Sequence, residues 1–149
     1  MTFIGYCDGA CRGNPGQTSA AWAVYIDGEL EYWGKQWLGP EPHTNNYAEY
    51  WGLILLLEWA TKFNVTNMTI YSDSMLVVNQ VNEKWKVKHN DLKPLQSKAT
   101  GLLIRGRHRL VHVDGHAGNE GNEFVDKLCN LVLDKVERDN GKALQDAAR

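Results

Sequence analysis

The sequence predicts an α/β fold in which a five-stranded mixed sheet is flanked by helices, and three observations support this prediction. Three β-favouring segments come first and are separated by short turns rich in glycine, which indicates an antiparallel meander. Helical periodicity then alternates with short apolar segments as far as the C-terminal region. The resulting order, βββαβααβα, predicts three antiparallel strands extended by parallel crossovers.

Apolar periodicity and turn residues place the individual elements. The first segment favours a strand buried on both faces, the glycine-rich turn Gly13–Gly16 follows it, and Asp27-Gly28 is a strong hairpin signal. The expected strands cover residues 2–8, 20–26, 30–37, 68–72 and 110–113. The expected helices cover residues 46–63, 74–81, 90–104 and 123–138. We expect one domain over residues 1–140, followed by a frayed C-terminal tail over residues 141–149.

The composition excludes several classes of protein. A net charge of −2 argues against a generic nucleic-acid coat but permits a local basic surface. The three cysteines are an odd number without CxxC spacing, so they favour neither a disulfide framework nor a zinc site. The sequence shows no apolar run typical of a signal peptide or a transmembrane helix. We therefore expect a cytoplasmic protein with no membrane partner, and we also expect a monomer.

Two carboxylates come at the ends of expected strands. Asp8 closes the first strand and Asp73 the fourth, and crossover geometry makes these two strands parallel neighbours. Their C-terminal ends then lie side by side, where an α/β sheet usually binds its ligand. Structural roles are also open to both residues. Asp8 before a glycine is a turn signal, and Asp73 could cap the next helix, as could Ser74.

Two further carboxylates come from expected helices. Glu49 lies on the apolar stripe with Leu53 and Leu56, so its side chain should face the sheet. It could instead complete a capping box with Asn46. Asp126 sits at the edge of the apolar stripe of the last helix and could face solvent.

Carboxylates that converge in a buried place need cations. Two of them about 4 Å apart repel by about 4 kcal/mol at an effective dielectric constant of about 20. Three or four together would protonate or separate unless divalent ions held them. Oxygen ligands favour Mg²⁺ or Mn²⁺ over zinc, and several carboxylates without a Cys or His cage suit two-metal phosphoryl chemistry.

Four blocks of sequence, taken together, resemble type 1 ribonuclease H. They are Asp8–Gly16, Thr44–Glu49, Tyr71–Ser74 and Val113–Asn119, and Asn122–Asp126 continues the last block in the family's register. The resemblance implies a ribonuclease H-like fold and a metal-dependent endonuclease that cuts the RNA strand of an RNA/DNA hybrid. It also implies two Mg²⁺ or Mn²⁺ ions, one activating a water and the other stabilising the leaving 3′ oxygen, and products with 5′-phosphate and 3′-hydroxyl ends.

The resemblance also implies a role for each matching residue. The catalytic and metal-binding carboxylates would be Asp8, Glu49, Asp73 and Asp126. His116 matches a loop histidine that assists proton transfer or product release, although a histidine in a glycine-rich loop is usually a polar surface residue. The positions that contact the hybrid near its backbone and minor groove are matched by Asn14, Asn45 and Asn46.

Three departures from the family pattern bear on substrate binding. Met75 stands where many members have a glutamine that touches the substrate, and Asp114 adds negative charge beside the histidine loop. The segment Glu83–His89 is shorter than the basic protrusion of some bacterial members. It alternates cations with Trp85, which suits either a surface that tracks phosphates or a solvated face. Its candidate substrate-binding residues are Lys84, Lys86 and Lys88.

Two other functions fit parts of the pattern. One is another nuclease of the same broad fold, such as a junction resolvase or a transposase-like DNase, and the other is a catalytically inactive module that binds hybrids. The pair Asn45-Asn46 and the loop Gly115–Gly118 count against the first. All four acidic positions are occupied, which counts against the second.

Overall fold

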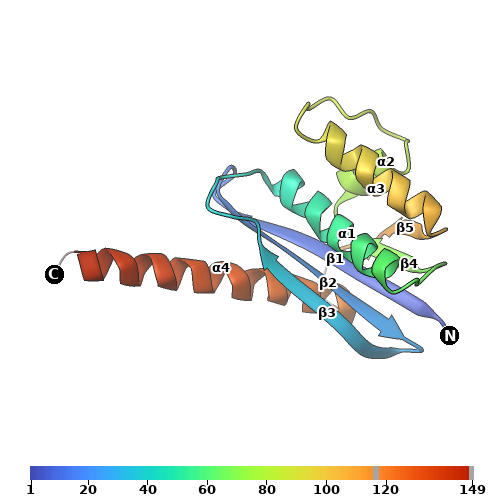
Figure 1. Ribbon diagram of the computed structural model, residues 1–149, viewed down its shortest axis with the longest axis horizontal. Coiled ribbons are helices and arrows are strands. Elements are labelled where there is room, and N and C mark those ends of the chain that lie inside the picture. The colour runs from blue at the N-terminus through green and yellow to red at the C-terminus, as the bar shows by residue number, and fades with distance from the viewer. Residues whose placement is uncertain (116–117, 148–149) are drawn as a thin grey trace.

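One mixed sheet organises the fold (Figure 1). The computed structural model describes the backbone of residues 1–115 and 118–147. The strands lie in the order β3-β2-β1-β4-β5, and their bounds are β1 Phe3–Arg12, β2 Gln17–Ile26, β3 Glu29–Trp37, β4 Thr69–Ser72 and β5 Arg109–His112. β1–β2 and β2–β3 pair antiparallel, whereas β1–β4 and β4–β5 pair parallel. The predicted α/β fold with a five-stranded mixed sheet is therefore confirmed.

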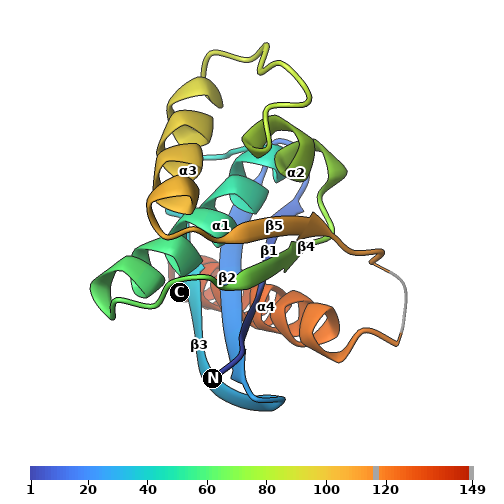
Figure 2. The same cartoon turned by 90° about the vertical axis from the view of Figure 1, so that its right-hand side faces the viewer.

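Helices cover both faces of this sheet (Figures 1 and 2). Their bounds are α1 Asn45–Lys62, α2 Met75–Val81, α3 Lys93–Arg105 and α4 Glu120–Ala147. The first three lie on one face, and α4 crosses the other, where it packs against β1, β2 and β3. Hydroxyl caps start two of the helices: Thr44 Oγ1 accepts from the Tyr47 amide, and Ser74 Oγ accepts from the Val77 amide.

Each face of the sheet has its own core. On the α1 side, large aliphatic side chains such as Leu53 and Ile54 are fully buried. On the α4 side, Ala21 and Ala23 of β2 pack against Val125 and its helical neighbours. Because side chains alternate along a strand, Ala21 and Ala23 both face α4, and their small size allows this helix to lie close to the sheet.

Strand β1 is longer than predicted. Its antiparallel pairing with β2 continues as far as Arg12 opposite Gln17, and the turn Gly13–Gly16 closes this hairpin. Its parallel pairing with β4 stops earlier, at Cys7 opposite Ser72. The prediction that Asp8 ends the strand is therefore wrong. Asp8 lies inside β1, at the point where the parallel ladder stops and the antiparallel one continues.

Helix α4 is also longer than predicted, at both ends. It begins at Glu120 because Asn119 Oδ1 accepts from the Asn122 amide and so caps the first turn. It continues through residues 141–147, where the sequence predicts a frayed tail. The Lys135–Asp139 ion pair, at 2.8 Å and helical spacing, supports the turn that precedes these residues. Gly141 costs about 1 kcal/mol relative to alanine, which does not stop a helix of this length.

Two glycines bring α1 unusually close to β1. A Cβ atom added to Gly9 would lie 2.2 Å from the backbone carbon of Ala48, and one added to Gly52 would lie 2.3 Å from the Asp8 carbonyl oxygen. No side chain fits in either place. Because neither glycine carries a side chain, the first turns of α1 lie directly against the middle of β1.

Among the helices of residues 1–115 and 118–147, none is both long enough and apolar enough to cross a bilayer.

Candidate active site

Three carboxylates meet where α1 approaches the sheet. Asp8 comes from β1, Glu49 from the first turns of α1, and Asp73 from the residue that follows β4. Each offers a carboxylate oxygen, and these oxygens all lie within 4.8 Å of one another. Asp8 and Asp73 are adjacent because Cys7 pairs with Ser72 in the parallel ladder. Glu49 joins them because Gly9 and Gly52 allow the first turns of α1 to lie directly against β1 beside Asp8.

The three carboxylates are difficult to ionise together. Burial, followed by the charge of Asp73, raises the pKa of Asp8 to about 7, although the Gly9 amide donates to its Oδ1 at 2.9 Å. Burial and the charges of Asp8 and Asp73 raise the pKa of Glu49 well above its ordinary value. Burial likewise raises the pKa of Asp73. The folded protein therefore holds protons at this site that free carboxylates would release at neutral pH.

A divalent cation fits this arrangement. Glu49 Oε2 is buried and has no hydrogen-bond partner within residues 1–115 and 118–142, whose side chains are described. An unsatisfied buried oxygen costs free energy unless something positive meets it. The donors around it are carboxylate oxygens, which are the ligands that Mg²⁺ and Mn²⁺ prefer. Asp8, Glu49 and Asp73 are thus the residues that could hold metal.

Asp126 lies at the edge of this site. It projects from α4 and is exposed, and it is not one of the three residues that share the 4.8 Å cluster. Its charge nevertheless raises the pKa of both Asp8 and Asp73, which places it near them. Its backbone oxygen accepts from Asn130 Nδ2 at 3.0 Å, within α4. The structure therefore brings three of the predicted carboxylates into contact and sets the fourth on the solvent side.

Two further residues, Asn122 and His112, act on Asp73 although their roles were not predicted from the sequence. Asn122 is only 4% exposed, and its side chain donates a hydrogen bond that lowers the pKa of Asp73. Its Oδ1 is buried without a partner among the described side chains. His112 places Nε2 3.2 Å from the Asp73 backbone oxygen, and its charge also lowers the pKa of Asp73. Helical phase could have identified Asn122, since it precedes the buried Val125 by three positions.

The three asparagines implicated in hybrid binding lie around the start of α1. Asn14 Oδ1 accepts from the Asn45 amide at 3.1 Å, which joins the turn Gly13–Gly16 to the helix. Two backbone hydrogen bonds of 2.9 Å between Gly16 and His43 reinforce this junction. Asn46 is the next residue of the helix, three positions before Glu49. The candidate substrate contacts therefore sit one helical turn from the carboxylate cluster.

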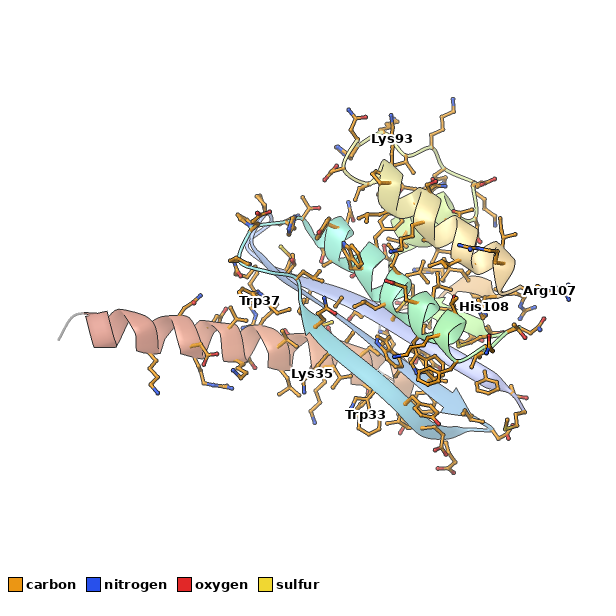
Figure 3. The ribbon with its side chains drawn as sticks, in the orientation of Figure 1. Trp33, Lys35, Trp37, Lys93, Arg107 and His108 are labelled. Carbon is orange, nitrogen blue, oxygen red and sulfur yellow. The ribbon has the colours of Figure 1, made fainter. Side chains whose placement is uncertain are left out.

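The lysine segment lies apart from the asparagines, between α2 and α3. Lys84, Lys86 and Lys88 are exposed, and the first two line a hollow of about 540 Å³ together with Trp85 and Lys93. Lys93 lies at the start of α3 (Figure 3). Met75 is 52% exposed at the start of α2, and Asp114 is exposed after β5. His116 lies outside the described residues.

The raised pKa values predict an unusual pH dependence of stability in metal-free protein. Unfolded Asp8 would release its proton near pH 4, whereas the folded residue releases it near pH 7. The folded state therefore binds more protons between these values, and its stability falls as the pH rises through them. Over the whole range from pH 4 to pH 7 the loss would be about 4 kcal/mol. Urea unfolding in EDTA at pH 5 and pH 8 covers about two of these three pH units and should show a loss of about 3 kcal/mol.

Buried His108 acts in the opposite direction and needs a control. Burial lowers the pKa of His108, so the folded state binds fewer protons at this residue than the unfolded state does. The stability of the protein therefore rises as the pH increases through the pKa of the unfolded histidine. The variant Asp8→Asn keeps His108 and removes the Asp8 proton. The difference in unfolding free energy between wild type and this variant should therefore shift in favour of the variant from pH 5 to pH 8. A difference that does not change with pH would contradict the prediction.

Comparison with known proteins identifies the family. The RNase H family model matches residues 2–133. The chain belongs to the RNase H family. Its sequence is similar to Ribonuclease H of Methylobacillus flagellatus, with 37% identity over 144 residues, covering 88% of this chain and 91% of that protein. The resemblance to type 1 ribonuclease H is thereby confirmed, and the chain is a ribonuclease H enzyme.

Solved structures agree with this assignment. RNase H1 from the halophilic archaeon Halobacterium salinarum superimposes with a TM-score of 0.81 at 34% identity, covering 91% of this chain and 99% of that one. LC11-RNase H1, solved in complex with an RNA/DNA hybrid, gives a TM-score of 0.79 at 29% identity, covering 91% and 99%. The RNase H family hydrolyses RNA in RNA/DNA hybrids with the help of metal ions, and the carboxylate cluster of this member is compatible with such ions.

Proposed function

We propose that this ribonuclease H cuts the RNA strand of RNA/DNA hybrids with two Mg²⁺ or Mn²⁺ ions, leaving 5′-phosphate and 3′-hydroxyl ends. The observation that carries the proposal is the convergence of Asp8, Glu49 and Asp73, with raised pKa values and an unsatisfied oxygen on Glu49. Without bound cations, the ionised carboxylates of this site would repel one another. Asp126, on the solvent side, would complete the metal-binding set.

The residues of the chain have distinct tasks in this proposal. Two bound divalent ions would supply positive charge that favours ionisation of the attacking water and stabilises the leaving oxygen. The three clustered carboxylates would release their protons and hold that charge in place. The Gly9 amide orients Asp8, and the Asn122 amide orients Asp73. His116 would assist proton transfer or product release, as its motif implies.

Substrate recognition would depend on the asparagines and lysines. The ribose 2′-OH distinguishes RNA from DNA, and an A-like duplex displays it in the minor groove. The amides of Asn14, Asn45 and Asn46 can both donate to it and accept from it. The DNA strand would lie toward the segment between α2 and α3, where phosphates would meet Lys84, Lys86 and Lys88. We propose that the enzyme acts as a monomer.

An assay on matched duplexes tests this function. We expect labelled RNA/DNA hybrid to be cut in Mg²⁺ or Mn²⁺ far faster than double-stranded RNA, with no cutting in EDTA and none of double-stranded DNA. Rates below saturation should fall steeply with salt, because phosphate contacts release counterions. Product ends should be 5′-phosphate and 3′-hydroxyl, because water and not the 2′-OH attacks. Efficient cutting of DNA, as a DNase of the same fold would show, or 2′,3′-cyclic phosphate ends would overturn the proposal.

A further inference from the structure

Arg12 joins β1 to α4 through several contacts. It is the last residue of β1, and its guanidinium lies 2.6 Å from Asp134 Oδ1 and 2.9 Å from Glu137 Oε2. Its Nη2 also donates to Asn130 Oδ1 at 3.1 Å and to the Asn130 backbone oxygen at 3.4 Å. These acceptors come from consecutive turns of one face of α4. A planar guanidinium with five donors can hold such a set in one geometry.

On its other side, Arg12 leads directly into the turn that carries Asn14. That turn is joined to α1 by Asn14 and by Gly16, as described above. The thiol of Cys11 lies 2.8 Å from the Gly13 oxygen and 3.3 Å from the His43 oxygen, which adds a further contact at the same junction. The turn is thus held between the start of α1 on one side and α4, through Arg12, on the other.

The same face of α4 carries the fourth carboxylate. Asn130, which accepts from Arg12, donates its side-chain amide to the backbone oxygen of Asp126 one turn earlier. Hydrogen bonds therefore connect Asp126 through Asn130 to Arg12, and the chain leads from Arg12 directly into the turn of Asn14. The family model stops at residue 133, so Asp134 and Glu137 belong to an extension of α4 beyond the matched region.

We propose that Arg12 is a positioning residue, which uses the extension of α4 to set the Asn14 turn relative to the helix of Asp126. The proposal rests on the proposed function, because the turn matters only if it contacts the hybrid. Arg12 fixes where the substrate-binding amides stand before substrate arrives. Its loss should therefore weaken substrate binding and leave the chemical step nearly unchanged.

If Arg12 bound the substrate directly, replacing Asp134 and Glu137 would change the affinity for the hybrid in the opposite direction. If Arg12 contacted a substrate phosphate, Asp134 and Glu137 would compete with that phosphate for the guanidinium. Replacing them would then free Arg12 and remove negative charge near a polyanion, so the hybrid would bind more tightly. If Arg12 instead positions the turn, the same replacement removes its anchor, and the hybrid binds more weakly despite the more favourable charge.

The experiment measures KM and kcat on an RNA/DNA hybrid, and unfolding by urea, for a small set of variants. The set comprises Arg12→Ala, Arg12→Lys and the double variant D134N/E137Q. Asp139→Asn is the control, because it neutralises a carboxylate of the same helix that pairs with Lys135 and not with Arg12. A lysine has one ammonium and cannot form the fork, so Arg12→Lys should recover little.

We expect KM to rise about tenfold in Arg12→Ala and several-fold in D134N/E137Q, with kcat within about twofold, since contacts made equally in the bound complex and in the transition state affect KM alone. Asp139→Asn should not raise KM. The dependence of KM on salt should be unchanged in Arg12→Ala, whereas a lost phosphate contact would reduce its slope by about 1. A lower KM in D134N/E137Q, or an unchanged KM in Arg12→Ala, would overturn the inference. Wild-type protein that fails to cut the hybrid would overturn the proposed function instead.

Discussion

Replacing Asp73 by asparagine should reduce hybrid cleavage by about a thousandfold or more, the loss expected when a metal-binding carboxylate is removed. The fold should remain, because the asparagine side chain keeps the shape and can still accept from Asn122. The metal-free variant should also melt at a higher temperature than wild type at pH 8. Burial and the charge of Asp126 raise the pKa of Asp73, so its ionised form is unfavourable without cations.

Cleavage assays and thermal melts with and without Mg²⁺ check both parts of this expectation. Mg²⁺ should raise the melting temperature of wild type and have little effect on the variant, since ligand binding stabilises the folded state by mass action. The control is Asp91→Asn, which removes an exposed carboxylate from the loop before α3. It should behave as wild type in both assays. Near-normal cleavage by Asp73→Asn would place the active site elsewhere.

Replacing Gly9 by alanine should destabilise the protein by about 3 kcal/mol and abolish metal binding together with cleavage, because overpacking displaces neighbouring backbone. The added methyl carbon would lie 2.2 Å from the Ala48 carbonyl carbon and 2.3 Å from the Glu49 amide nitrogen. Neither atom belongs to a flexible side chain, so α1 must move away from β1. Glu49 would move with it and leave Asp8.

Gly101→Ala is the matched control for this substitution. Gly101 lies inside α3, and a Cβ atom there meets no atom within 4 Å among the described residues. It should stabilise the protein by about 0.5 to 1 kcal/mol, since alanine favours a helix more than glycine does. Urea unfolding and isothermal titration with Mg²⁺ measure the two variants. Equal stability of Gly9→Ala and wild type would show that the helix does not depend on this close approach.

The sequence contained enough information to predict the sheet and the convergence of three carboxylates. The order of elements predicted parallel neighbours for Asp8 and Asp73. Helical phase predicted that Glu49 faces the sheet, and the structure places it there, 7% exposed. The capping box was the alternative for Glu49, but Thr44 caps the helix instead. Local periodicity was sufficient in these cases because each depends on one element or one pairing rule.

Other features were not predictable because they depend on contacts between distant residues. Arg12 and Asn130 are separated by 118 positions, and no local pattern relates them. Periodicity placed the end of α4 near residue 138 rather than 147, because the mostly polar residues 139–147 continue the helix without an apolar stripe. The continuation of β1 past Asp8 depends on β2, whose pairing extends four residues beyond it. Asn122 was overlooked although its phase was visible, because an amide is not a usual metal ligand.

The central position of β1 has a consequence for hydrogen exchange. The backbone around Asp8 opens only when β1 separates from its neighbours, so its amides should exchange at a rate close to that of global unfolding. The far end of α4 projects beyond the sheet (Figure 1), and its amides should exchange much earlier by local fraying. Fraying that reached Asp134 and Glu137 would release Arg12 and so loosen the Asn14 turn, while Asp8 would stay in place in β1. Substrate affinity would vary with that motion, and the geometry of the chemical step would not.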